Sequence, residues 1–296
     1  MKFHRIAFVL LLSIASHANA ATQPMTHGEP ASGNLTLQRI YQLATEKEDP
    51  AAMYALGTIL AEGAGVAQNY EEAFNWFFRA ADRGNNEAMN YLGVAYAAGH
   101  GVPQNNAFAL RWFLKAAQNG SVEAMVNAAL AYRLGVGSPV DYGESAKWLE
   151  HAAARGDAGA MNGLAVLFET GTGVPQDHLA ATMLLMQSAK LGYPVAMENL
   201  GVLYANGEGG KRDNVVAYAW LGAALEAGLQ GEDLDVTMQE LDVLAQQLGA
   251  ADLARARKLM DTFTAGITQP PAAETPRHQP SSNPRNDSSI RKPSYL

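Results

Sequence analysis

The chain has 296 residues, of which 21 are Lys or Arg and 29 are Asp or Glu, so its formal net charge is -8. An acidic chain is a poor candidate for binding nucleic acid, because phosphate contacts need a basic face. The chain contains no cysteine, which excludes disulfides, thiol catalysis, thiolate metal sites and a lipid-modified cysteine. We therefore expect its stability to come from packing alone.

Residues 1–20 have the features of a secretory signal peptide. Lys2 and Arg5 precede an apolar run at 6–14, and Ala18-Asn19-Ala20 supplies small residues at the positions that a signal peptidase reads. The run is shorter than the roughly 20 residues of a spanning helix, so we expect no membrane span. Cleavage after Ala20 removes two cations and no acid, which changes the net charge from -8 to -10. We expect a periplasmic protein, with secretion beyond the cell as the alternative.

The first predicted helix covers residues 34–48, after a linker at 21–33. Ile40, Leu43 and Ala44 lie roughly where the second helix of a helical repeat would place its apolar stripe. The terminal units of a repeat array need a cover for their apolar face. This segment is therefore predicted to be an N-terminal capping helix.

A period of 36 residues governs the middle of the chain. The five blocks are 49–84, 85–120, 121–156, 157–192 and 193–228. Each block carries an Ala-Met pair at the same position, beginning with Ala52-Met53, and each ends on glycine. Five matching steps without an insertion indicate an array of structural repeats.

Each block reads as two helices joined by a glycine-containing loop. In the first block, Ala52, Leu56 and Leu60 share one helical stripe, and Trp76 and Phe77 belong to the stripe of the second helix. The tryptophan returns as Trp112, Trp148 and Trp220, with Leu184 in its place in the fourth block. Recurrence at one register indicates that the tryptophans and the methionines fill the core. The small residues beginning with Gly57 are expected to let a neighbouring helix approach closely.

The second block carries the pattern A-M-x-x-L-G-x-x-Y-x-x-G-x-G-V-P-Q-N followed by A-x-x-W-x-x-x-A-A-x-x-G, from Ala88 to Gly120. This pattern resembles the Sel1-like repeat, a relative of the tetratricopeptide repeat. The period of 36 separates it from the 34-residue tetratricopeptide pattern. The third block departs most, with Ala128 and Ala129 in place of Leu-Gly. The resemblance implies an all-α protein, a right-handed α-solenoid of five helix-turn-helix repeats, that serves as a binding scaffold.

Two further segments follow the repeats. Residues 229–265 are predicted to form two capping helices divided by Gly249, with Leu234, Met238 and Leu241 in the stripe of the first helix. Residues 266–296 are rich in Pro, Ser, Asn and Gln, a composition that buries too little apolar surface to fold, so we expect a disordered, mildly basic tail.

The resemblance places the first helix of each pair on a concave face. Positions two residues before the Leu-Gly pair and one after it, together with the end of that helix, vary from block to block while the stripe does not. The predicted partner-binding residues are Tyr54, Thr58, Glu62, Asn90, Val94, Arg133, Asn162, Glu198 and Asn206, with Tyr54 and Glu198 as anchors. The partner is an unknown protein or peptide, and the chain itself is expected to be a monomer. An ordinary solvated helix face remains the alternative for each residue.

Catalysis is the competing interpretation. Some cysteine-rich secreted Sel1-repeat proteins are described as acting on penicillin-type substrates or peptidoglycan fragments, which suggests a periplasmic hydrolase as an alternative function. Their disulfides are absent here, and the chain lacks Gly-x-Ser-x-Gly and His-Glu-x-x-His motifs. Glu169 or Asp177 would serve as acid or base only with a partner that the sequence does not place. We therefore expect no enzyme, no metal and no cofactor; a host-directed secreted binder is a third possibility.

Overall fold

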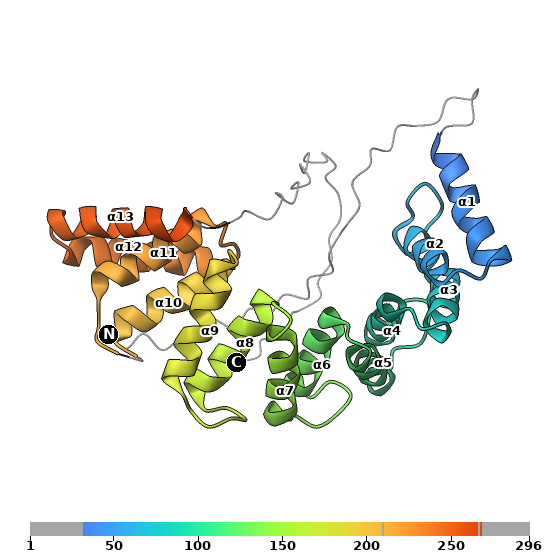
Figure 1. Ribbon diagram of the computed structural model, residues 1–296, viewed down its shortest axis with the longest axis horizontal. Helices are drawn as coiled ribbons and strands as arrows, with labels where there is room; N and C mark the ends of the chain where they lie inside the picture. The colour runs from blue at the N-terminus through green and yellow to red at the C-terminus, as the bar shows by residue number, and fades with distance from the viewer. Residues whose placement is uncertain (1–31, 209, 266, 268–296) are drawn as a thin grey trace, which may run out of the picture.

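The computed structural model describes residues 32–208, 210–265 and 267. All the regular structure in this part of the chain is helical, and thirteen helices follow one another along an arc (Figure 1). None of these helices is both long and apolar enough to cross a membrane. The predicted signal peptide and nearly all of the predicted tail lie outside the described residues.

The helices pair as the 36-residue period predicts. The first helices of the repeats are α2 (Pro50–Glu62), α4 (Asn86–Ala98), α6 (Val122–Leu134), α8 (Ala158–Thr170) and α10 (Pro194–Asn206). The second helices are α3 (Tyr70–Asp82), α5 (Asn106–Gln118), α7 (Tyr142–Ala153), α9 (His178–Lys190) and α11 (Asn214–Glu226). Before the array lies α1 (Ser32–Glu46), and after it lie α12 (Glu232–Gln247) and α13 (Ala250–Thr264). The prediction of an all-α solenoid with capping helices is confirmed.

Local signals define the ends of the helices in each repeat. Asp49 caps α2 by accepting a hydrogen bond from the backbone N–H of Ala52 at 2.8 Å, which satisfies one of the free donors of the first turn. Gly99 ends α4 in the left-handed region, with φ of 77°. Gly101, the second loop glycine, lies against the backbone of Tyr70 in the preceding repeat, so a Cβ has no room there. The paired glycines are therefore architectural.

The repeat stripe forms the core. The methionine that recurs at the same position of every repeat is buried in all five repeats, as Met53, Met89, Met125, Met161 and Met197. A Cβ on Gly57 would lie 2.8 Å from Cε1 of Phe77, so the small residue admits the ring of the second helix in its own repeat. The close approach predicted at these positions is confirmed.

The tryptophans also pack inside the array. Trp76 is only 7% exposed, while Trp112, Trp148 and Trp220 are partly buried against the core. Trp220 stacks on Phe263 of α13, with ring centroids 3.9 Å apart. These contacts confirm a packing role.

The face that α12 buries differs from the predicted stripe. Met238 is 52% exposed, whereas Thr237 and Leu244 are buried. The cause is a polar contact, because the hydroxyl of Thr237 donates a hydrogen bond to Oε1 of Glu198 on α10. Apolar spacing alone does not reveal a helix that packs through a hydroxyl group.

Candidate functional site

Asparagine pairs connect the first helices of adjacent repeats. Nδ2 of Asn127 on α6 donates to Oδ1 of Asn90 on α4 at 2.9 Å. The same contact recurs two repeats later, where Nδ2 of Asn199 on α10 donates to Oδ1 of Asn162 on α8 at 2.9 Å. Asn90 and Asn162 are buried. Both residues therefore join repeats together.

Glu198 occupies the equivalent position on α10 and is also buried. Its Oε1 accepts the hydrogen bond from Thr237 at 3.1 Å, and its Oε2 has no hydrogen-bond partner among the described residues. Burial, followed by the negative charges of Asp233 and Glu240, raises the pKa of Glu198 to about 7.

Asn90, Asn162 and Glu198 were predicted to be exposed partner-binding residues. Their side chains are buried, so they present almost no surface to a partner. At these three positions the side chain points at the next helix of the array, which is α6 for Asn90, α10 for Asn162 and α12 for Glu198, and is covered by it. A polar side chain buried there needs a hydrogen-bonding partner, which explains the asparagine pairs.

The six other predicted binding residues stay at least partly accessible. Tyr54 is half-buried against Phe77, with ring centroids 5.6 Å apart, and burial raises the pKa of its phenol. The hydroxyl of Thr58 donates to the carbonyl of Tyr54 within α2, and Glu62 is exposed. The half-buried residues of later repeats are Val94, Arg133 and Asn206. The structure spreads these six residues along the array and does not gather them into one cavity.

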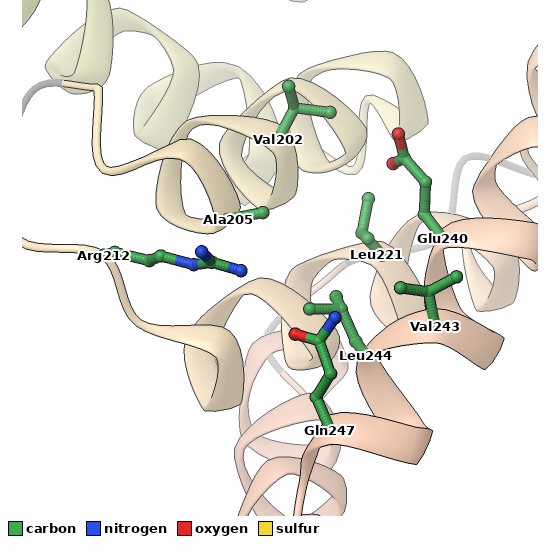
Figure 2. Close-up of a pocket in the computed structure, with 8 residues that line it drawn as sticks. All are labelled: Val202, Ala205, Arg212, Leu221, Glu240, Val243, Leu244 and Gln247. Carbon is green, nitrogen blue, oxygen red and sulfur yellow. The ribbon is translucent and has the colours of Figure 1, made fainter. Parts of the chain in front are cut away.

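Two small hollows lie between repeats on the first-helix face. The hollow between α6, α7 and α8 is lined by Val126, Ala129, Leu130, Arg133, Ser145, Leu149, Gly163 and Leu167. The hollow between α10, α11 and α12 is lined by Val202, Ala205, Arg212, Leu221, Glu240, Val243, Leu244 and Gln247 (Figure 2). Figure 2 shows Arg212 and Glu240 on opposite sides of its apolar floor.

The two hollows share a register. Leu130 and Val202 are the residues one place after the Leu-Gly position, and Arg133 and Ala205 lie three residues further along. Arg133 is half-buried, and its burial lowers the pKa of the guanidinium. The sequence register thus predicts which positions border the hollows, although it does not predict the hollows themselves.

A larger groove of about 350 Å³ lies between α1 and the first repeat. It is lined by Leu37, Gln38, Tyr41, Leu56, Ile59, Leu60, Val66 and Glu72. Its size falls in the range of small-ligand and side-chain pockets, and its lining is mostly apolar. The sequence does not predict this groove, because the groove depends on the distance between α1 and α2. The i, i+4 pair of Leu37 and Tyr41 on α1 was the available signal.

Glu169 has an ionisable neighbour in the structure. Its Oε1 lies 2.7 Å from Nδ1 of His178 at the start of α9, while its buried Oε2 has no hydrogen-bond partner in the described part of the chain. Asp177 caps α9 by accepting from the backbone N–H of Ala180 at 2.9 Å. None of these three residues lines the hollows or the groove. Among the described residues, no group of three or more His, Asp or Glu side chains could hold a metal ion.

Comparison with solved structures finds the same fold elsewhere. A protective antigen present in uropathogenic Escherichia coli strains, which displays an SLR fold, is 26% identical to this chain with a TM-score of 0.71. The match covers 86% of this chain and 53% of the antigen, so the chain spans about half the antigen's length. A Sel1 repeat protein from Oxalobacter formigenes is 26% identical with a TM-score of 0.66, and the match covers 78% of this chain and 98% of that protein.

The sequence comparisons agree with the period. No curated protein sequence matches the chain. The family described as Sel1 repeat matches residues 50–85, 86–121, 122–157, 158–193 and 194–229, each match beginning one residue after the corresponding predicted block. These five matches cover more than half of the chain, which therefore belongs to the Sel1 repeat family.

Proposed function

We propose that this chain is a scaffold that binds another protein, or an extended peptide, on the face formed by its first helices. Proteins built from Sel1 repeats are generally protein-interaction scaffolds. The observation that carries the proposal is the pair of hollows at equivalent inter-repeat positions, one beside Leu130 and Arg133 and one beside Val202 and Ala205.

The hollows suit a partner that makes several shallow contacts. Each has an apolar floor with at least one charged side chain among its lining residues, Arg133 in one and Arg212 with Glu240 in the other. The hollows measure only about 10 and 20 Å³, which is room for about one water molecule. An apolar side chain of the partner would therefore lie over each hollow while a polar group nearby meets the charge. The binding free energies of several contacts along one chain add up, so a deep pocket is not required.

A separate groove lies at the front of the array, on a different side of α2 from the positions equivalent to the hollow lining, which are Tyr54, Gly57, Thr58 and Ala61. The helix α2 lines the apolar groove beside α1 through Leu56, Ile59 and Leu60, and it also carries Thr58 and exposed Glu62. A large apolar side chain of the partner would be buried in this groove, where burial contributes most to affinity. Glu72, the acidic residue among the groove's lining residues, would then select for a basic group.

Site-specific cross-linking tests this assignment. A photoreactive amino acid is placed at Glu62 in one variant and at exposed Glu150 of α7 in another, and cells expressing each variant are irradiated. We expect one discrete cross-linked partner at position 62 that is absent at position 150. The same products at both positions, or none at position 62, would contradict binding on the first-helix face.

Export is the second part of the proposal, and it rests on residues 1–20. Fractionation of cells that express the full chain, beside cells that express a variant lacking residues 2–20, provides the test. We expect the full chain in the periplasmic fraction and the shortened chain in the cytoplasm. Recovery in the culture medium would instead favour a host-directed partner outside the cell.

A hydrolase acting on peptidoglycan or on β-lactam-type substrates gains no support from the geometry. His178 and Glu169 form a hydrogen-bonded pair, but neither residue lines the groove or the hollows where a substrate would bind. A catalytic pair must lie within reach of a bound substrate. The pair instead links the end of α8 to the start of α9.

A further inference from the structure

A connected set of aromatic rings joins α3, α4 and α5 at the N-terminal end of the arc (Figure 1). Phe74 lies near Phe78 and Tyr96, with ring centroids 6.5 and 5.5 Å away. Tyr96 continues to Phe108 at 5.3 Å, and Phe78 meets Trp112 edge-on at 6.1 Å. Phe78 and Phe108 are 48% and 44% exposed, so both rings present apolar surface to solvent.

Two cations lie on these rings. The guanidinium carbon of Arg111 is 5.6 Å from the centroid of Phe108, and Nζ of Lys115 is 4.9 Å from the centroid of Trp112. Helix α5 contains no acidic residue, and neither cation forms a salt bridge with another described residue. The rings hold the two charges at the surface without neutralising them.

Comparison with the third repeat shows how α5 differs at the positions of Phe108 and Arg111. Glu144 on α7 pairs with Lys147 three residues later, and the equivalent residues of α5 are Phe108 and Arg111. The first repeat also has an acid at this position, Glu72. In the second repeat, the exposed ring of Phe108 therefore stands where a carboxylate would neutralise Arg111. Fold maintenance does not require this replacement, because the neighbouring repeats keep the acid.

We propose that the surface formed by Phe78, Phe108, Arg111, Trp112 and Lys115, here called the α3–α5 surface, binds an acidic peptide segment that also carries aromatic or aliphatic side chains. Charge complementarity favours this occupant, because two cations without a salt-bridge partner among the described residues lie on the rings of Phe108 and Trp112. Carboxylates of the peptide meet Arg111 and Lys115 while its apolar side chains cover the rings. Aromatic residues and arginine are the side chains that most often dominate protein interfaces.

The small number of cations favours a peptide over an anionic membrane. Basic segments that adsorb to anionic lipid contain clusters of about four to eight Lys or Arg residues, and this surface has two such cations on its rings. The α3–α5 surface is built mainly from second helices, so it is distinct from the first-helix face of the proposed function.

Selection of random peptides displayed on phage tests the inference, with the full-length protein as bait. Enriched peptides are synthesised, and their affinities are measured for the parent and for three variants. The Arg111→Glu/Lys115→Glu variant reverses the two cations. Phe108→Glu restores the residue type found in the first and third repeats, so it is compatible with the fold. The matched control, Arg257→Glu/Lys258→Glu, makes the same charge change on exposed positions of α13.

We expect enriched peptides that combine Asp or Glu with Phe, Trp or Leu. Their affinity should fall by about tenfold or more in the first two variants and stay unchanged in the control. Melting curves of all variants confirm that each is folded. Enrichment of neutral or basic peptides, no enrichment at all, or equal affinity for Arg111→Glu/Lys115→Glu would overturn the inference. So would binding to phosphatidylglycerol vesicles in place of peptides.

One further variant separates this inference from the proposed function. Thr58→Lys/Glu62→Lys alters the first-helix face alone. Peptides that lose affinity for Thr58→Lys/Glu62→Lys but not for Phe108→Glu would support the first-helix face and overturn the α3–α5 surface. The opposite result would support the α3–α5 surface independently of the proposed function.

Discussion

Asn199 on α10 donates a hydrogen bond to Asn162 on α8, and the two buried side chains form a bridge between adjacent repeats. Asn127 and Asn90 make the same bridge two repeats earlier, at the same distance of 2.9 Å. Because an amide has fixed donors and acceptors, such a bridge is satisfied in one register only. We infer that these bridges help to set the offset between successive first helices.

Replacing Asn162 by alanine should destabilise the protein by about 1 to 3 kcal/mol, because the buried Nδ2 of Asn199 loses its acceptor. Urea unfolding followed by circular dichroism measures this loss. The double variant Asn162→Ala/Asn199→Ala should lose less than the sum of the two single variants, since neither partner remains unsatisfied. Additive losses in the cycle would show that the bridge carries no coupling energy.

Replacing Gly57 by alanine should destabilise the first repeat even though alanine is the better helix former. The new Cβ would lie 2.8 Å from the ring of Phe77, and overpacking of this kind costs about 1 to 3 kcal/mol. The gain in helix propensity is about 1 kcal/mol. The additional substitution Phe77→Leu should remove part of the clash, so its effect on Gly57→Ala should be smaller than its effect on the parent. A stabilised Gly57→Ala variant would disprove the close contact.

Glu198→Gln should alter how stability depends on pH. The pKa of Glu198 is raised from 4.5 to about 7 in the folded protein, so the folded state holds a proton that the unfolded state releases. Stability from this group is therefore complete below about pH 4.5 and is lost as the pH rises towards 7. Glutamine stays neutral throughout.

The relevant measurement is the difference in unfolding free energy between the parent and Glu198→Gln at a series of pH values. We expect the variant to gain stability relative to the parent between pH 4.5 and about 7, and the difference to level off above that range. Taking the difference cancels the raised pKa of Glu123, which changes the parent's stability in the same direction. A difference that does not vary with pH would show that Glu198 is ionised normally.

Trp76→Ala should cost about 3 to 5 kcal/mol, which is the range for removing a large buried aromatic side chain. Trp76 is 7% exposed, whereas Trp148 is only partly buried. Trp148→Ala should therefore lower the midpoint of denaturant unfolding by less than Trp76→Ala does. Equal shifts would mean that the tryptophans contribute through the regular repeat and not through their individual burial.

The sequence predicts the architecture of this chain well because repetition tests every inference five times. The Ala-Met pair at the start of each first helix identifies a stripe, and the methionines are buried in all five repeats. The closing glycine of each block and the loop glycines predict where helices end. One chain thus supplies its own internal comparison, even where the third repeat replaces Leu-Gly with Ala128 and Ala129.

The binding positions were harder to predict, for a physical reason. Helix periodicity states which residues share a face, but the rotation between repeats decides whether that face meets solvent or the next helix. Asn162 and Glu198 vary between repeats, as binding residues do, yet they are buried in inter-repeat hydrogen bonds. The groove beside α1 and the ring contacts of Phe108 with Tyr96 likewise depend on distances between helices. These distances leave no periodic signal in the sequence.

Affinity measurements on matched variants test whether the first-helix face binds a protein partner. The partner captured at position 62 is titrated against the parent, against Thr58→Lys/Glu62→Lys, and against Gln118→Lys/Glu150→Lys, which makes the same charge change on exposed second-helix positions. We predict a loss of about tenfold or more in affinity for the first variant and little change for the second. Equal affinities, or a loss confined to the second variant, would show that the partner does not bind the first-helix face.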